Sequence, residues 1–434
     1  MWFSSIYVLL FVSLIGCILP RTLHHWRILR AEPAPAPASW GRLPYRRVAL
    51  ATGGVDAALD RAVAALRASR YRVVRDGDGV RAEFGYLRET GNLVFHVALV
   101  GILATLAAMG GYGWNGQRVI IEGQTFTNQL ASFDSFHPGS WFSESQLVPY
   151  GVTLKSFVPE YTRDPVKDVW MPIDYTANLS VTDSSGTRDA TLKVNDPLPI
   201  GNSQVYLLGN GFAPVITVRA PDGTVVFDQP VVFLSQDGNL TSVGVVKIPD
   251  GLSKQLGMQG FFYPTAVKLD SGALSSNNPQ PTNPTVTFNL YTGDLGLDSG
   301  TAANVFQLPI ATMKQIAGRH TGKQVVLTPG DVFTIPGGLG TIEFSGLRRF
   351  IGVEIRHDAT QLGVGISAFF LVAGLLASLG TRRRRVWIRV GGTARRPELE
   401  WGGMSRGDDP RLDAALDRLV DRAHQTSTDK VTEA

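Results

Sequence analysis

Cysteine is nearly absent from this chain of 434 residues: Cys17 stands alone, inside an apolar segment near the start. One cysteine excludes an intramolecular disulfide framework and the Cys-x-x-Cys motifs of thiol oxidoreductases. The segment around Cys17 holds no cation that would activate a thiolate, so we interpret this residue as a small buried hydrophobic side chain. Gly-x-Ser-x-Gly and His-Glu-x-x-His are missing too, which argues against a serine hydrolase or a zinc protease.

Charge is also sparse, since Asp, Glu, Lys and Arg make up 18% of the residues. The formal net charge of +4 comes mostly from arginines that flank apolar stretches. No basic patch interleaved with aromatic residues occurs, so we predict no nucleic-acid partner. The basic residues instead carry information about membrane topology.

Three apolar stretches are close to the roughly 20 residues that a membrane-spanning helix needs. They cover residues 1–20, 91–112 and 361–380. The first has neither a basic leading region nor a small-residue cleavage site, so we interpret it as a true span rather than a signal peptide. Its start almost at Met1 suggests a chain that lacks an upstream part or begins outside the membrane. We expect a multi-pass protein of the lipid bilayer.

Arginines predict the orientation, because loops rich in basic residues stay in the cytoplasm. Arg21, Arg27 and Arg30 follow the first span, Arg88 precedes the second, and the run Arg382–Arg385 follows the third as a topology anchor. We therefore expect the cytoplasmic (plasma) membrane, with the large domain outside and the C-terminus inside. The predicted order is a span at 1–20, a cytoplasmic loop at 21–88, a span at 91–112, an extracytoplasmic domain at 113–358, a span at 361–380 and a cytoplasmic tail at 381–434.

The two cytoplasmic segments each contain strand and helix patterns. The loop opens with alternating Pro and Ala over residues 32–38, which is typical of a semi-rigid extended spacer. We predict that loop and tail pack together as one small split α+β domain. The predicted elements are strands at 48–50, 71–75, 80–84, 386–390 and 398–401, and helices at 56–67 and 410–423.

The external segment is rich in strand patterns. Short apolar runs alternate with turn sequences such as Pro221-Asp222-Gly223 and Pro249-Asp250-Gly251. Helix patterns are nearly absent, apart from a short candidate helix at Thr312–Ala317. The predicted fold class is an α + β membrane protein with three transmembrane helices, a large extracytoplasmic β-sandwich-like domain and the small split α+β domain.

One ionisable side chain, His96, lies inside the second span, in an uncharged stretch from Gly91 to about Tyr112. Hydrocarbon makes an imidazole expensive to bury, so an intramembrane histidine is a functional-site hypothesis by default. Imidazole is also a common ligand of metal ions and of haem iron. The alternative is a structural histidine whose ring is hydrogen-bonded to a neighbouring helix. His24 and His25, by contrast, are expected to be solvated loop residues next to lipid headgroups.

Several motifs, in order along the chain, resemble those of the ResB-type cytochrome c biogenesis proteins of System II. They are Leu10–Arg21, Tyr86–His96, Glu122-Gly123-Gln124, Val205–Gly209 with Ala213-Pro214, Gln236–Leu240, Tyr291–Gly296 and the closing span with Arg382–Trp387. The resemblance covers nearly the whole chain. It departs from the family in two places: a further span usually precedes the first motif, and Asp-Pro-Gly is often found where this chain has Asp358-Ala359-Thr360.

The resemblance implies a haem-delivery role. Proteins of this type work with a ResC-type tryptophan-rich membrane haem protein; together they move haem b across the membrane and support its attachment to apocytochrome c. A thioredoxin-like thiol reductant is a further expected partner. The chain itself would be an assembly factor rather than an enzyme, within a cytochrome c haem lyase complex formed with its partner. The tryptophan-rich motif is absent here, so we do not expect the external haem-presenting surface on this chain.

The site residues expected for this role are His96, Arg88 and His357. The resemblance assigns the haem iron to His96, shared with a histidine of the partner. Arg88, just outside the span, could form a charge-assisted pair with a haem propionate. His357, where the third span begins outside, is a second candidate for haem contact. The competing hypothesis is a membrane-anchored cell-surface binding module, a β-domain on a stem that would not need His96.

Overall fold

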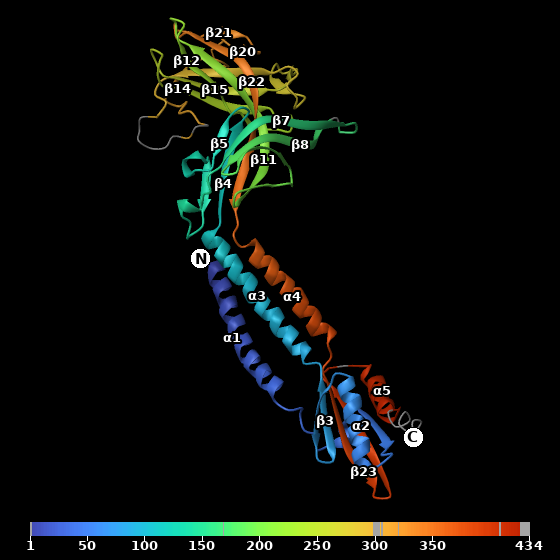
Figure 1. Cartoon of the computed structure of the whole chain (residues 1–434). Coiled ribbons are helices and arrows are strands. Elements are labelled where there is room, and N and C mark those ends of the chain that lie inside the picture. Colours follow the sequence, from blue (N-terminus) through green and yellow to red (C-terminus); the bar gives the residue numbers. More distant parts are fainter. Residues whose placement is uncertain are drawn as a thin grey trace. The chain divides into compact units, whose positions relative to one another are not determined.

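The computed structural model describes residues 2–167, 169–297, 304, 307–319, 321–407 and 409–425. The chain forms two compact units, and Figure 1 shows the elements of both. Unit 1 contains Met1–Met109 and Thr360–Ala434, and unit 2 contains Gly110–Ala359. Unit 1 is therefore built from the two ends of the chain, and unit 2 from its middle.

Among the described residues, three helices are long and apolar enough to cross a membrane, and they coincide with the three apolar segments that the sequence predicted as spans. They are α1 (Trp2–Arg30), α3 (Leu87–Tyr112) and α4 (Gln361–Gly380). At 1.5 Å per residue, the 20 residues of α4 span about 30 Å, the thickness of a bilayer's hydrocarbon core. Most of the side chains along these helices remain accessible, as lipid-facing residues require.

Helix α1 does not end at Pro20, where the sequence predicted the end of the first span, but continues to Arg30. A proline removes one backbone donor, and membrane helices tolerate this where local adjustments satisfy the freed carbonyl. His24 and His25 consequently lie on a helix and not in a loop. His24 is exposed, but His25 is only 7% exposed, so the expectation of a solvated residue is wrong for His25.

Helices α3 and α4 pack closely through small residues. A Cβ atom added to Gly91 would lie 2.6 Å from the backbone nitrogen of Ser378, and one added to Gly374 would lie 2.6 Å from the backbone nitrogen of Phe95. Both distances are shorter than a carbon–nitrogen contact allows, so these positions need glycine. Small residues let membrane helices approach each other in this way.

Unit 1 also holds a five-stranded antiparallel sheet with two covering helices. The strand order is β1-β24-β23-β3-β2, so the two strands of the C-terminal segment lie between strands of the N-terminal segment. The helices α2 and α5 pack against the sheet around a core that includes Leu59, Leu66, Trp401 and Leu416. The elements are β1 (Tyr45–Leu50), α2 (Val55–Ala68), β2 (Arg72–Asp76), β3 (Gly79–Phe84), β23 (Arg384–Thr393), β24 (Arg396–Ser405), α5 (Leu412–Gln425) and the 3₁₀ helix η1 (Trp40–Arg42).

The Pro/Ala segment lies along this sheet. The indole Nε1 of Trp387 donates a hydrogen bond to the carbonyl oxygen of Ala34 at 2.8 Å, and a guanidinium nitrogen of Arg81 donates to that of Pro33 at 3.4 Å. A proline-rich backbone keeps its carbonyls free as acceptors because it forms no internal hydrogen bonds. The spacer is thus tied to the sheet at two points.

Unit 2 is a β-rich body, as predicted. Two strands of 17 residues, β11 and β22, pair along their length and take part in two hydrophobic cores. One core lies against the sheet β13-β14-β15-β18-β19 and includes Phe212 and Phe344. The other lies against the sheet β5-β7-β8-β9 and includes Leu154 and Val353. Each long strand serves both cores because a strand buries alternate residues wherever another sheet covers it.

The strands of unit 2 are β4 (Trp114–Ile121), β5 (Thr125–Thr127), β6 (Ser135–Pro138), β7 (Gly151–Asp164), β8 (Val169–Asp183), β9 (Gly186–Lys193), β10 (Leu198–Ile200), β11 (Ser203–Arg219), β12 (Val225–Pro230), β13 (Leu234–Ser235), β14 (Ser242–Ile248), β15 (Leu256–Tyr263), β16 (Ala266–Lys268), β17 (Leu274–Ser276), β18 (Thr285–Thr292), β19 (Lys314–Ala317), β20 (Val325–Leu327), β21 (Val332–Thr334) and β22 (Thr341–His357). Two 3₁₀ helices, η2 (Leu130–Ser132) and η3 (Glu144–Gln146), complete the elements.

The short helix predicted at Thr312–Ala317 is wrong. Lys314–Ala317 forms strand β19, and Ala317 pairs with Leu290 on β18. Ala317 is fully buried in the core of that sheet. A six-residue segment carries too weak a local preference to resist pairing with an adjacent strand.

Candidate functional site

The imidazole of His96 lies on α3, one turn beyond Asn92. Its Nδ1 is 2.7 Å from the carbonyl oxygen of Asn92, which can only accept a hydrogen bond, so the proton is on Nδ1. The other ring nitrogen, Nε2, then carries the lone pair. Phe95 holds the ring edge-to-face, with ring centroids 5.1 Å apart. The hydrogen bond is thus to its own helix, and His96 makes none to another helix among the described residues.

His96 faces away from α4. Gly91 marks the side of α3 that touches α4, and His96 comes five residues later, a rotation of about 140° around the helix axis. His96 is half-buried, and its neighbour Val97 is exposed. The Nε2 lone pair is consequently presented on a side of the helix that α4 does not cover. Nε2 has no hydrogen-bond partner among the described residues, and an imidazole held through Nδ1 could ligate a metal or haem iron through that atom.

Arg88 is engaged with the chain itself. Its Nη1 donates to the carbonyl oxygen of Arg406 at 2.7 Å. Arg88 precedes His96 by eight residues, about 12 Å along the helix axis. Its remaining guanidinium nitrogens make no hydrogen bond to another described residue. The contact to Arg406 ties the start of α3 to the end of β24.

His357 belongs to unit 2 and is also fixed through Nδ1. That nitrogen is 2.6 Å from the carbonyl oxygen of Asn202, and the ring stacks on Trp114 with centroids 6.0 Å apart. Trp114 is buried among Phe133, Phe136 and other aromatic residues. The stacking and the hydrogen bond give His357 a structural role at the end of β22.

A buried network of arginines and acids lies where α3 and α4 join the sheet. Extended backbone places successive side chains on opposite faces, so the four consecutive arginines diverge in alternation. Arg383 and Arg385 bond Glu83 through their Nε atoms at 2.8 and 2.9 Å. Arg384 bonds the other acid, Asp409, through Nε at 2.7 Å, and Arg382 pairs with it too. We call the six residues the arginine–acid network: Glu83, Arg382, Arg383, Arg384, Arg385 and Asp409.

Both acids of this network are almost inaccessible, with 3% exposure for Glu83 and 2% for Asp409. Burial alone would raise the pKa of the Glu83 carboxyl, but hydrogen bonds from Arg383, Arg385 and Tyr86 outweigh it and leave the pKa below its ordinary value. Burial would likewise raise the pKa of Asp409, but hydrogen bonds from Arg384 and Arg382 outweigh it, so the pKa of Asp409 is also lowered. Burial and the neighbouring Glu83 raise the pKa of the Tyr86 hydroxyl to about 12. Both acids are therefore ionised at neutral pH.

His25 is a buried imidazole that sequence reasoning placed wrongly. Thr90 donates its hydroxyl hydrogen to the carbonyl oxygen of Tyr86, so its oxygen accepts a hydrogen bond from Nε2 of His25 at 2.9 Å. The Nδ1 atom of His25 is closed off from solvent and has no hydrogen-bond partner among the described residues.

The acids of the network were also missed. Glu83 sits at the end of a predicted strand, and nothing in its local sequence separates it from a solvated glutamate. Only the pairing of β3 with β23, which sets Glu83 opposite Arg385, creates the site. The run of four arginines is the one sequence feature that could have indicated a buried ionic site. Side chains of a strand alternate between its two faces, so some of these arginines must point towards the protein interior and need an acidic partner.

Unit 2 contains a groove with a cavity of about 700 Å³ between β4, β12 and β14. Its walls include the apolar residues Val119, Phe227 and Val246. An ion pair of 2.7 Å between Arg118 and Asp134 lies on the lining, and Asp134 also accepts a hydrogen bond from the backbone of Val119. The part of the chain that the structure describes has no group of three or more His, Cys, Asp or Glu side chains able to hold a metal ion.

Within the described residues, these features define a membrane protein with three helices able to span a bilayer, a β-rich body and an α+β unit whose sheet is made from both ends of the chain. The sequence model of the ResB-like family matches residues 1–417 of this chain, so the chain belongs to this family. The family prediction made from the motifs is confirmed.

Two curated relatives share part of the sequence. The chain is 28% identical over 193 residues to a protein of Gloeobacter violaceus named "Cytochrome c biogenesis protein CcsB", a match that covers 40% of this chain and 38% of the relative. It is 27% identical over 202 residues to a protein of the same name from Picosynechococcus sp., covering 45% and 40%. The matched part therefore spans about two fifths of these relatives.

Proposed function

We propose that this chain is a subunit of a membrane complex that carries haem across the cytoplasmic membrane and supports its attachment to apocytochrome c. Family membership and the name of both relatives support a role in cytochrome c biogenesis. The observation that carries the haem part is His96, an imidazole on an apolar helix whose Nδ1 is held by Asn92 and whose Nε2 has no hydrogen-bond partner among the described residues.

Haem b is the cargo in this proposal, and His96 supplies one axial ligand through Nε2. Asn92 keeps the ring in the ligating tautomer and fixes its direction. A single histidine leaves the second axial position to a partner, which we propose to be a ResC-type tryptophan-rich haem protein. The guanidinium nitrogens of Arg88 that its bond to Arg406 leaves free are available to a propionate.

The proposed orientation places the sheet of unit 1 in the cytoplasm and unit 2 outside. Basic residues flank the inner ends of the spans, in agreement with the bias of cytoplasmic loops. In this arrangement the chain acts as an assembly factor, and the complex with the partner performs the ligation. Apocytochrome c and a thioredoxin-like reductant are the partners proposed on the outer side.

A second candidate function is a membrane-anchored binding module. The apolar groove of unit 2 favours it, since a concave apolar surface with a few polar groups is the usual form of a ligand site. The two candidates differ in what they require of His96: a module needs only the groove, whereas haem delivery needs the imidazole.

The haem content of the purified chain, alone and with its partner, tests the proposal. His96→Ala should abolish the Soret absorbance, and added imidazole should restore part of it by occupying the vacated ligand position. The matched control is His24→Ala, because His24 is an exposed histidine on α1 and the change removes the same ring. Retention of haem and of cytochrome c maturation in His96→Ala would rule out the assignment and favour the binding module.

A further inference from the structure

A small pocket lined by arginines lies on the sheet of unit 1, next to the ends of α3 and α4. It has a volume of about 320 Å³ and is lined by Arg383, Arg385, Met404, Ser405 and Arg406. Arg385 pairs directly with Met404 across β23 and β24, and the backbone of Arg406 bonds that of Arg383. Residues that are opposite each other in an antiparallel pair share a face, so the three guanidinium groups converge on one side.

That side is the face of the sheet opposite to α2 and α5. Val386 and Ile388, which alternate with the pocket's arginines, are buried against those helices. The pocket face carries Trp387, which packs on Trp40 and Leu43 in a separate small cluster. No core packing therefore accounts for the arginines on this face.

The positive charge of the pocket is not fully neutralised. Arg383 and Arg385 share the single carboxylate of Glu83, and Arg406 pairs with Glu89 at 2.5 Å. Three cations thus share two described carboxylates. Arg383 is buried at 5% exposure, whereas Arg385 and Arg406 are 36% and 68% exposed, so the excess positive charge is accessible to an anion from outside the protein.

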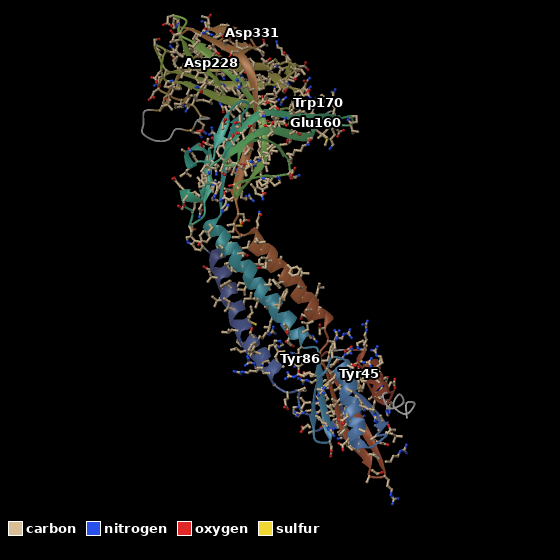
Figure 2. All side chains as sticks on the ribbon, in the orientation of Figure 1. Tyr45, Tyr86, Glu160, Trp170, Asp228 and Asp331 are labelled. Atoms are coloured by element: carbon tan, nitrogen blue, oxygen red, sulfur yellow. The ribbon has the colours of Figure 1, made fainter. Side chains whose placement is uncertain are left out.

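The pocket also offers free hydrogen-bond donors. The guanidinium group of Arg383 has five N–H groups. Of these five, only the Nε–H donates to a described carboxylate, that of Glu83. The side chain of Arg383 is only 5% exposed, and its terminal nitrogens make no hydrogen bond to a described residue. Its planar group lies over the ring of Tyr86, 5.3 Å from the centroid, which fixes its direction (Tyr86 is labelled in Figure 2).

The position of the pocket matches the level of lipid headgroups. Helix α4 is about as long as the hydrocarbon core is thick and ends at Gly380, three residues before Arg383. Three extended residues cover about 10 Å, which reaches the headgroup layer. A guanidinium group can donate two parallel hydrogen bonds to the oxygens of one phosphate. Basic pockets beside membrane helices bind anionic lipid headgroups through such contacts.

We propose that this pocket binds the phosphate group of an anionic phospholipid and so anchors the sheet of unit 1 at the membrane surface. The lining favours a phosphate over a haem: four of its five residues are polar or charged, while a porphyrin needs an extended apolar wall. The inference goes beyond the proposed haem delivery and does not depend on it.

Lipid titration of the detergent-purified full-length chain, followed by native mass spectrometry, tests the proposal. Phosphatidylglycerol should bind the wild type, and phosphatidylcholine should not displace it. Arg406→Gln should weaken phosphatidylglycerol binding about tenfold, the effect of losing one charge-assisted contact. The matched control is Arg395→Gln, since Arg395 is an exposed arginine of the same domain without a described partner and should leave binding unchanged.

Glu89→Gln separates loss of the anion site from loss of the Arg406–Glu89 ion pair. It breaks the same pair but removes a competing carboxylate, so phosphatidylglycerol should bind at least as tightly as in the wild type. Equal weakening by Arg406→Gln and Arg395→Gln, or weakening by Glu89→Gln, would overturn the proposal. So would inorganic phosphate that binds as tightly as the lipid and depends on Arg406, or haem that displaces the lipid.

Discussion

Replacing Glu83 by glutamine is the sharpest test of the arginine–acid network. Glu83 accepts hydrogen bonds from Nε of Arg383 at 2.8 Å, from Nε of Arg385 at 2.9 Å and from the hydroxyl of Tyr86 at 2.8 Å. Glutamine keeps the shape of the side chain but loses the negative charge and one acceptor oxygen. Arg383, with 5% exposure, then becomes a buried cation without a carboxylate.

The expected loss of stability follows from burial. Removing one partner of a buried ion pair costs about 3–5 kcal/mol. Arg385 is 36% exposed and can be rehydrated, which places Glu83→Gln near the lower end, at about 3 kcal/mol. Such a loss raises the opening equilibrium of the β3–β23 pair by roughly two orders of magnitude.

Hydrogen exchange of the full-length chain in detergent, read by mass spectrometry on peptides from β3 and β23, measures this opening. The control is Glu32→Gln, because Glu32 is 65% exposed and pairs with Arg81 at 3.1 Å. An exposed pair contributes less than about 1 kcal/mol, so exchange should change less than about fivefold. If both variants accelerate exchange in β23 equally, Glu83 is not a buried ionic partner and the reasoning fails.

Three further outcomes are expected. Because the pKa of Asp409 is lowered in the folded protein, its stabilising contribution is full above about pH 4 and is lost as the pH falls through the lowered pKa; the protection factor of β23, which is the exchange rate corrected for the intrinsic pH dependence of amide exchange, should be constant from neutral pH down to that point and smaller below it. Gly374→Val should destabilise the α3–α4 contact by about 1–3 kcal/mol, measured by thermal unfolding, whereas Gly365→Val, with open space at Cβ, should not; equal effects would disprove the close contact. Deleting the tail after Arg385 removes β24 and all of β23 beyond Arg385, the two strands that separate β1 from β3, and should expose β1 to rapid proteolysis; a protected β1 would contradict the sheet order.

Local sequence determined the membrane helices and most short elements. Apolar runs of about 20 residues have no other stable solution than a spanning helix, and this made residues 91–112 and 361–380 predictable. The hairpin of β2 and β3 was equally clear, because alternating apolar residues flank an Asp-Gly-Asp-Gly turn. His96 was visible for the same reason: a lone imidazole in a hydrocarbon-compatible run stands out by composition.

Long-range pairing decided the rest. No local rule predicts that β23 pairs with β3, since the paired residues Arg384 and Phe84 are 300 residues apart in the chain. Ala317 became part of a strand because β18 offered it a ladder, against a weak helical preference. The close packing of Gly91 and Gly374 likewise depends on how two separate helices cross.

The candidate sites divide in the same way. The sequence by itself determined that His96 lies in an apolar segment long enough to cross a membrane and that four arginines follow the third such segment. Only the tertiary structure decided that Nδ1 of His96 is hydrogen-bonded to Asn92, that Glu83 and Asp409 divide the arginines between them, and that His25 is buried. Chemical type and hydropathy are local properties of a residue, whereas hydrogen-bond partners and burial depend on segments that only folding brings together.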